Sequence, residues 1–334
     1  MLLDKNVLYR NIIEICFNVR MSVFFAFFTG LVGLWLGAEF LTRAAVAISK
    51  RFGLSEGFIG LTILAIASDI PEIMVSVTGA IEQKMLGVQV SNIVIGNIIG
   101  SNMGQIGLIM GLVGLISAVG FKKKMMFSEG MMMLGSVVVF YLTALDGRIS
   151  RVDGLIYLIF IAMYFFLTSR SYRLNKSVGK IKNGGVPWLP ILGFFVGMGI
   201  LVEASHLVLE NGLDLVAKLG ISQMVVGVLF VGLGTSLPEL VIATTAALKG
   251  NRDLSLGNLV GCFIVDNMLA LGLGAMISSW TVDRQVIEFD LPFLIFSVVV
   301  VMLFLLTKAR LEKRESLLIL GLYLTYVLLK VFGV

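Results

Sequence analysis

The sequence predicts an all-α polytopic membrane protein in which ten transmembrane helices form two inverted-topology repeats of five. Three observations predict it: an apolar composition, runs of membrane-spanning length and an internal repeat. Of 334 residues, 58% are hydrophobic and 14% are charged, and the mean hydropathy is +0.99. A soluble domain cannot cover so apolar a surface, whereas a lipid-facing helix bundle can.

Charge and cysteine usage narrow the function classes. The net charge of +5 does not indicate nucleic-acid binding, because the basic residues form short clusters between apolar runs, as in membrane proteins. Cys16 lies near the N-terminus and Cys262 deep in an apolar segment, so the two cysteines give neither a disulfide framework nor metal-ligand spacing. His206 is the single histidine and is expected to be a packed or hydrogen-bonded helix residue.

A helix needs about 20 apolar residues to cross the hydrocarbon core of a bilayer. Ten runs between polar breaks meet this length, near residues 22–48, 57–82, 88–118, 125–145, 152–169, 188–210, 222–248, 254–279, 287–307 and 314–332. Residues 1–20 form an N-terminal extension, either a short peripheral helix or an extended segment. The basic connection 170–187 is the longest polar one, and it divides the chain into repeats at 21–169 and 188–334.

The distribution of basic residues predicts the orientation. Seventeen of the 26 lysines and arginines lie in one set of alternating loops, which includes the central connection. Cytoplasmic loops of membrane proteins carry the excess of Lys and Arg. The central loop is therefore expected to be cytoplasmic and both termini extracytoplasmic.

The chain repeats itself around two Pro-Glu pairs. Gly60 to Glu72 aligns with Gly227 to Glu239 at an offset of 167 residues. Further on, Gly96-Asn-Ile-Ile-Gly100 aligns with Gly257-Asn-Leu-Val-Gly261 at an offset of 161. Five predicted spans separate the copies, and since five is odd, the copies cross the membrane in opposite senses. Inverted repeats of this kind place a binding site near the midplane, between the halves.

The repeated segments carry the chemistry of a cation site. Pro71 and Pro238 interrupt helices at membrane depth, and broken backbone is tolerated there only where it lines a cavity. A carboxylate at mid-bilayer costs at least about 2.5 kcal/mol, so Glu72 and Glu239 need partners or protons. Freed carbonyls together with carboxylates form an oxygen cage that suits sodium or calcium.

Helical spacing groups further polar residues with these glutamates. The faces are Ser68, Asp69, Glu72 and Ser76; Thr235, Ser236 and Glu239; Asn97, Ser101 and Gln105; and Asn258, Cys262 and Asp266. Serine, threonine and asparagine often join transmembrane helices by hydrogen bonds instead. We favour this helix-joining role for Ser76, Ser91, Thr245 and Asn267. Glu39 and Glu203 either line an ion pathway or lie near the interface.

These motifs resemble the alpha-repeats of the cation/calcium exchanger superfamily. Ala67-Ser-Asp-Ile-Pro-Glu72 is similar to the first repeat, and Gly234-Thr-Ser-Leu-Pro-Glu239 to the second. The ten-span layout fits the prokaryotic sodium/calcium exchangers. The resemblance implies electrogenic exchange of sodium for calcium by alternating access. The ion ligands it implies are Ser68, Glu72, Ser101, Thr235, Ser236, Glu239 and Asp266.

Three positions depart from the family pattern. Asp69 stands where a serine is usual, Gln105 replaces asparagine, and Cys262 replaces serine. The extra carboxylate raises the negative charge of the cage, and the sulfur is softer than an oxygen. The predicted metal set is therefore Ser68, Asp69, Glu72, Ser101, Gln105, Thr235, Ser236, Glu239 and Asp266. We hypothesise that Asp69 takes part in proton or extra-cation coupling.

The expected function is a secondary active antiporter of the cell membrane that exchanges Na+ for Ca2+. The alternative is a proton-coupled or other divalent-cation exchanger on the same scaffold. An intramembrane enzyme is disfavoured because the spans hold no protease, serine/histidine or zinc motif, and a channel because inverted, broken helices indicate gating. The expected partners are the transported cations and the lipid bilayer, with no cofactor, no nucleic acid and no obligate protein partner.

Overall fold

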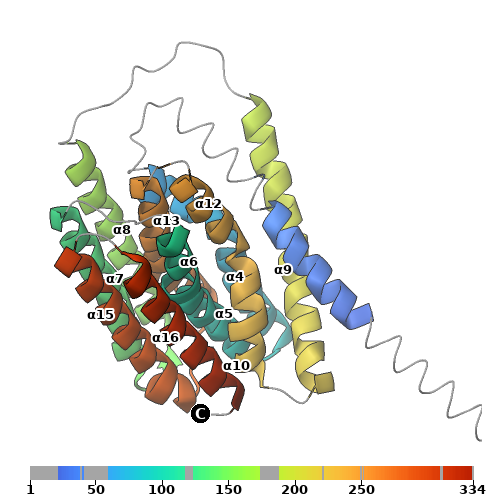
Figure 1. The fold of residues 1–334 in the computed structure, drawn as a ribbon. Helices are drawn as coiled ribbons and strands as arrows, with labels where there is room; N and C mark the ends of the chain where they lie inside the picture. Colours follow the sequence, from blue (N-terminus) through green and yellow to red (C-terminus); the bar gives the residue numbers. More distant parts are fainter. Residues whose placement is uncertain are drawn as a thin grey trace, which may run out of the picture.

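The structure is a bundle of helices (Figure 1). The computed structural model describes residues 22–37, 40, 59–116, 123–173, 188–219, 222–248, 250, 252–308 and 311–332. The predicted N-terminal extension 1–20 lies outside these residues, as do Glu39 and most of the basic connection.

The first half begins with an apolar helix, Ser22–Gly37. It continues with η1 (Ile59–Leu64), α3 (Ala65–Ser68), α4 (Ile70–Leu86), α5 (Ser91–Met103), η2 (Gly104–Ile109), α6 (Met110–Ile116), α7 (Lys123–Ala144) and α8 (Arg151–Arg173), where η marks a π-helical turn. These bounds lie within a few residues of the predicted second to fifth spans, because long apolar runs are the strongest signal in a membrane sequence.

The second half has a similar order, with additional short elements. It contains α9 (Trp188–Leu219), α10 (Gln223–Val226), η3 (Gly227–Gly232), α11 (Leu233–Thr235), α12 (Leu237–Leu248), α13 (Arg252–Val265), η4 (Asp266–Ala270), α14 (Leu271–Ile277), η5 (Val286–Asp290), α15 (Leu291–Lys308) and α16 (Lys313–Phe332). One departure from the all-helical prediction joins the halves. The strands β1 (Arg148–Ile149) and β2 (Trp280–Thr281) pair antiparallel, and two-residue strands are too short to produce a periodic pattern in sequence.

Six helices among the described residues are long and apolar enough to cross a membrane, and a seventh arises if the bent pair Gln223–Thr235 and Leu237–Leu248 is one span. The predicted count of ten is therefore not confirmed. Two of the six are central: Ser91–Ile116 is 83% buried and Ser255–Ile277 is 78% buried, against 28–44% for the other four. These central helices are the two copies of the Gly-Asn repeat.

Close helix crossings recur at equivalent places in the two halves. A Cβ on Gly100 of α5 would lie 2.2 Å from the Val228 carbonyl oxygen of η3. A Cβ on Gly261 of α13 would lie 2.9 Å from the Leu61 carbonyl oxygen of η1. Gly261 and Leu61 are the repeat partners of Gly100 and Val228. Each central helix thus crosses the other half's π-helical turn at a glycine, where backbones approach most closely.

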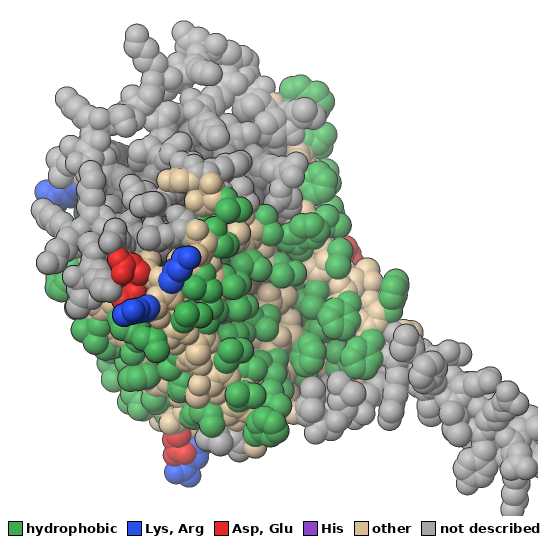
Figure 2. Space-filling view, in the orientation of Figure 1, with side chains coloured by type: hydrophobic (Ala, Val, Ile, Leu, Met, Phe, Trp, Pro, Cys, Tyr) green, Lys and Arg blue, Asp and Glu red, His purple; other side chains and the backbone are tan. Residues whose placement is uncertain are grey.

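The surface and one edge of the bundle fit a lipid environment. Figure 2 shows mainly hydrophobic side chains on the described part of this face, with few charged side chains, which mostly gather at its left border and at the bottom. The helix Ser22–Gly37 lies beside α9 at one edge of the bundle (Figure 1). Gly30 and Gly33 make this contact possible, since a Cβ on either would lie 2.9 Å from a side-chain carbon of Val208 or Ala204.

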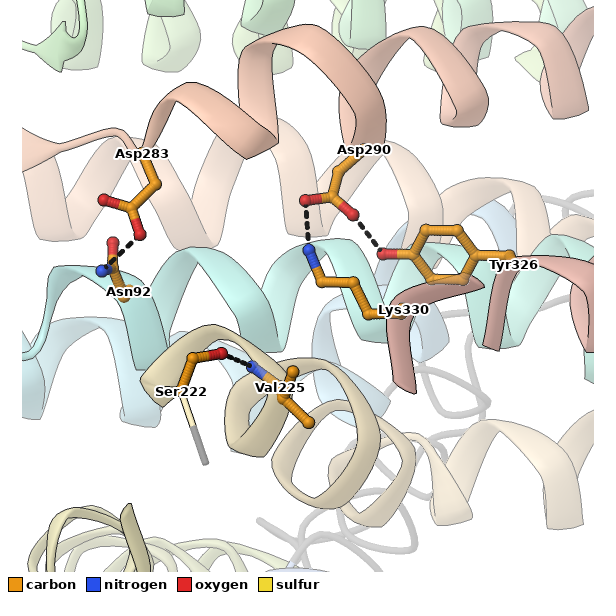
Figure 3. Close-up of polar contacts among 7 residues, drawn as sticks. All are labelled: Asn92, Ser222, Val225, Asp283, Asp290, Tyr326 and Lys330. Carbon is orange, nitrogen blue, oxygen red and sulfur yellow. Dashed lines mark hydrogen bonds and ion pairs between the residues drawn. The ribbon is translucent and has the colours of Figure 1, made fainter. Parts of the chain in front are cut away.

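A buried ion pair joins η5 to α16 (Figure 3). Lys330 Nζ lies 2.6 Å from Asp290 Oδ2, and the Tyr326 hydroxyl donates a 2.8 Å hydrogen bond to Asp290 Oδ1. Both charged side chains are fully buried, and charges in an apolar bundle require such pairing. The charge count that predicts the orientation places Lys330 among the nine basic residues of the extracytoplasmic loops, which is wrong because this lysine lies inside α16. Without Lys330, the loops that are predicted to be cytoplasmic still hold the excess of lysines and arginines.

We expect Gly100→Ala to lower the free energy of unfolding by about 1–3 kcal/mol, because its Cβ overlaps the Val228 carbonyl and the backbones must separate. Thermal unfolding of the purified protein in detergent measures the effect. Gly321→Ala is the matched control, since no atom lies within 4 Å of a Cβ at this helical position. Equal midpoints for the two variants would show that the crossing does not limit stability.

Candidate cation site

Two broken helices build the site. α3 gives way to α4 at Asp69, and α11 gives way to α12 at Ser236. Asp69 has φ −82° and ψ 5°, and Ser236 has φ −81° and ψ 7°, so the backbone leaves the helix in the same way in both halves. The breaks precede Pro71 and Pro238, as the sequence predicts.

Each break places a glutamate at a new helix N-terminus. Glu72 lies in the first turn of α4 and Glu239 in the first turn of α12. Proline is favoured at the start of a helix because the N–H that it lacks has no partner there. The N-terminal end of a helix carries a partial positive charge and favours a carboxylate. The repeated Pro-Glu therefore positions an acidic side chain where the helix dipole supports it.

Glu72 is held by hydroxyl groups from both halves. The Ser101 hydroxyl donates a 2.8 Å hydrogen bond to Glu72 Oε1 and lies 2.5 Å from Ser236 Oγ. Next to Ser236, the Thr235 hydroxyl donates to Asn97 Oδ1 at 3.0 Å. The Glu72 end of the site therefore includes hydroxyl and amide oxygens from both halves.

The equivalent end around Glu239 has different chemistry. Cys262 stands at the repeat position of Ser101, and its Sγ lies 3.2 Å from Ser68 Oγ. The Asn258 amide donates to both of these atoms at 3.2 Å. Asp69 stands at the repeat position of Ser236. A thiol and a second carboxylate thus replace the two serine hydroxyls that surround Glu72.

Repeat partners meet in the centre of the site. Gln105 and Asp266 are 161 residues apart, which is the offset of the repeat, and the Gln105 amide donates a 2.9 Å hydrogen bond to Asp266 Oδ2. Gln105 lies in η2, and Asp266 begins η4. π-helical turns often occur at functional sites because they shift side chains out of helical register.

Four buried carboxylates converge here. One oxygen each of Asp69, Glu72 and Asp266 lie within 4.8 Å of one another, as do an oxygen each of Asp69 and Glu239 and the Sγ of Cys262. Asp69 belongs to both groups. All four carboxylates are fully buried, and no described Lys, Arg or His forms an ion pair with them.

Several of the carboxylate oxygens have no hydrogen-bonding partner among the described residues: both oxygens of Asp69 and of Glu239, Glu72 Oε2 and Asp266 Oδ1. Burying unpaired carboxylates costs far more than burying paired ones, so they must be neutralised by cations or protons. Carboxylate, hydroxyl and amide oxygens are the ligands of hard cations such as Na+ and Ca2+. The donor set therefore fits a cation site.

The structure brings the nine predicted residues together. Each is at most 3% exposed, and each lies in the hydrogen-bonded or carboxylate groups described above or is adjacent to one. Their service as ion ligands remains a prediction. Cys262 was not in the predicted set, but it lies among the predicted residues. The cysteine that replaces the usual serine of the family at this position was the signal that could have identified it.

The other polar residues in the spans mainly join helices. Asn267 accepts from Asn102 and donates to Ser136, and Ser91 donates to Gln83, which confirms their structural role.

Four further residues complete the comparison with the sequence predictions. His206 is hydrogen-bonded as predicted, with Nδ1 2.8 Å from Glu82 Oε1. Ser76 Oγ is buried with no hydrogen-bonding partner among the described residues, so its predicted role in joining helices is not confirmed. Glu203 is exposed on α9. The Thr245 side chain lies outside the described residues.

Comparison with known proteins identifies the relatives of this chain. The sequence profile of the family described as sodium/calcium exchanger protein matches residues 22–170 and 189–332. The sodium/calcium exchanger MaX1 of Methanosarcina acetivorans is 28% identical, over 89% of this chain and 95% of that protein. The inner membrane protein YrbG of Escherichia coli is 29% identical, over 76% and 80%. A solved structure of the sodium-calcium exchanger NCX_Mj, soaked with Na+ and Sr2+, aligns with a TM-score of 0.67 at 27% identity, covering 92% of this chain and 98% of that one.

We expect Ca2+ to raise the unfolding midpoint of metal-free protein, because a cation that binds only the folded state adds about 2.7 kcal/mol at a hundredfold excess over Kd. Thermal unfolding in detergent measures this shift. Glu239→Gln should reduce it, since the variant removes a charge from the carboxylate cluster. Glu129→Gln is the control, because Glu129 is a buried carboxylate outside the cluster that accepts from Tyr164 at 3.0 Å. An equal shift of the unfolding midpoint by Ca2+ in both variants would contradict cation binding by the carboxylate cluster.

Proposed function

Because this chain belongs to the sodium/calcium exchanger protein family, we propose that it is a secondary antiporter that exchanges Na+ for Ca2+ across a membrane by alternating access. The observation that carries this proposal is the buried carboxylate cluster, which has no basic partner among the described residues and several oxygens free to bind cations. The relatives named as sodium/calcium exchangers support the choice of ions. The family is one of transporters and not of enzymes.

The geometry of the cluster supports a ligand assignment. Ca2+ takes six to eight oxygens, and the oxygen-only group of Asp69, Glu72 and Asp266 supplies three carboxylates for it. Ser101, Ser236, Thr235 and Gln105 surround this group, whereas Ser68 and Glu239 lie at the Cys262 end. Because Asp69 belongs to both groups, ions at the two ends compete for its oxygens. Such competition couples the release of one ion to the binding of another.

The proposed topology is two inverted repeats of five helices, 21–169 and 188–334, preceded by the extension 1–20 and joined by the cytoplasmic linker 170–187. The equivalent crossings at Gly100 and Gly261 and the equal backbone breaks at Asp69 and Ser236 support the two-fold plan. The excess of basic residues in one set of loops supports extracytoplasmic termini in a cell membrane. Transport then consists of exposing the same buried site to one side and then to the other.

A proton-coupled or other divalent-cation exchanger on the same scaffold is the second candidate. The observation that favours it is Asp69, whose repeat partner is the neutral Ser236. One additional carboxylate changes the number of positive charges that neutralise the cluster. It therefore changes which combination of ions balances the transport cycle.

We expect Glu72→Gln and Glu239→Gln to reduce Ca2+ uptake driven by a Na+ gradient about a hundredfold, because each removes a charged ligand from the cluster. Uptake of radioactive calcium into proteoliposomes measures this. Glu129→Gln, outside the cluster, is the matched control. Normal exchange by both cluster variants would overturn the proposed function.

We expect Asp69→Ser to lower the apparent affinity for Ca2+ about tenfold, since a doubly charged ion loses more from the removal of one carboxylate than Na+ does. Uptake driven in turn by a Na+ gradient and by a pH gradient, over a range of pH, separates the two candidate functions. If Asp69→Ser left the selectivity and the pH dependence unchanged, Asp69 would have no part in coupling.

A further inference from the structure

Cys262 lies inside the cation cluster and not in an apolar contact. Its side chain is fully buried in α13. Its Sγ contacts the Ser68 hydroxyl and the Asn258 amide, both at 3.2 Å. A cysteine that only filled space would contact apolar atoms, whereas this sulfur is surrounded by polar groups.

The neighbouring carboxylates point to a ligand. One oxygen each of Asp69 and Glu239 and the Cys262 Sγ lie within 4.8 Å of one another. Both carboxylates are fully buried, and none of their four oxygens has a hydrogen-bonding partner among the described residues. Two unpartnered acidic side chains thus face a sulfur at distances that one ion could bridge.

The two ends of the cluster differ in the softness of their donors. The group of Asp69, Glu72 and Asp266 contains oxygen alone, and Ser101 stands there at the repeat position of Cys262. Thiolate ligands select for Zn2+ and softer metals, whereas carboxylates and hydroxyls suit Ca2+. The cluster therefore offers oxygen-only coordination at one end and mixed oxygen and sulfur coordination at the other, and Asp69 belongs to both ends.

We propose that Asp69, Glu239 and Cys262 form a subsite of the cluster that binds thiophilic divalent cations such as Cd2+ and Zn2+. This rests on the proposed function only in that the cluster is a cation site. On binding, the thiol proton passes to solvent and a metal–sulfur bond forms, with no change of oxidation state. Three protein ligands leave a coordination position open, in contrast to the four ligands of closed structural zinc sites. Such a subsite permits the ion to leave again.

Cd2+ titration of the purified full-length protein tests the proposal through the ultraviolet sulfur-to-cadmium charge-transfer band. The sequence contains two cysteines, so a Cys16→Ser background leaves Cys262 as the only thiol. We expect the band to saturate at one Cd2+ per chain. In this background, Cys262→Ser should abolish the band and weaken Cd2+ binding about tenfold or more. Glu129→Gln is the matched control and should keep the band.

A second measurement does not depend on the folding of Cys262→Ser. Since Asp69 belongs to both groups, excess Ca2+ should displace Cd2+ and remove the band from the Cys16→Ser protein. Asp69→Ser, which keeps the thiol, should weaken Cd2+ binding about tenfold.

Three results distinguish the subsite from the proposed function. A protein that responds to Ca2+ but shows no cadmium band overturns the subsite and leaves the exchanger intact. A band that persists in Cys262→Ser also overturns it, because the sulfur would not be that of Cys262. A band that depends on Cys262 in a protein without sodium-driven Ca2+ uptake supports the subsite and refutes the exchange function.

Discussion

The structure depends on the burial of four carboxylates without a basic partner among the described residues. Asp69, Glu72, Glu239 and Asp266 lie at the centre of an apolar bundle, where an uncompensated charge is costly. Two features reduce that cost. The breaks at Asp69 and Ser236 create new helix N-termini, and amide and hydroxyl groups surround Glu72 and Asp266. They do not remove it, because several carboxylate oxygens have no hydrogen-bonding partner in the described part of the chain. The remaining cost is the physical basis for the proposal that the cluster binds cations.

The pair of Lys330 and Asp290 shows the other way to bury charge. There a lysine and a tyrosine satisfy both oxygens of the carboxylate. A site neutralised by a side chain is structural, because its counter-ion cannot leave. A site neutralised only by mobile ions can exchange them. The same bundle thus neutralises one buried carboxylate with a fixed lysine, whereas the carboxylate cluster is proposed to be neutralised by cations that can exchange.

The two-fold plan of the backbone is not matched by the side chains. The breaks at Asp69 and Ser236 have nearly identical dihedral angles, yet one residue is charged and the other neutral. The neighbours of Glu72 are two serine hydroxyls and the carboxylates of Asp69 and Asp266, whereas those of Glu239 are the Asp69 carboxylate and the Cys262 thiol. Gln105 and Asp266, repeat partners that bond to each other, carry the same asymmetry into the centre. A symmetric scaffold therefore holds a site with two chemically different ends.

The sequence by itself determined the membrane class, the positions of most helices, the repeat and nine polar residues that the structure brings together. Apolar run length, helical spacing and repeated motifs are local signals, and they survive in a single chain. Only the tertiary structure decided which residues meet: that Gln105 bonds Asp266, that Cys262 faces Asp69 and Glu239, and that Lys330 pairs with Asp290 inside the bundle. Periodicity indicates the face on which a side chain lies but not the partner opposite it. A lysine near a helix end is equally compatible with a loop or with a buried ion pair, and the packing of α16 against η5 decides between them.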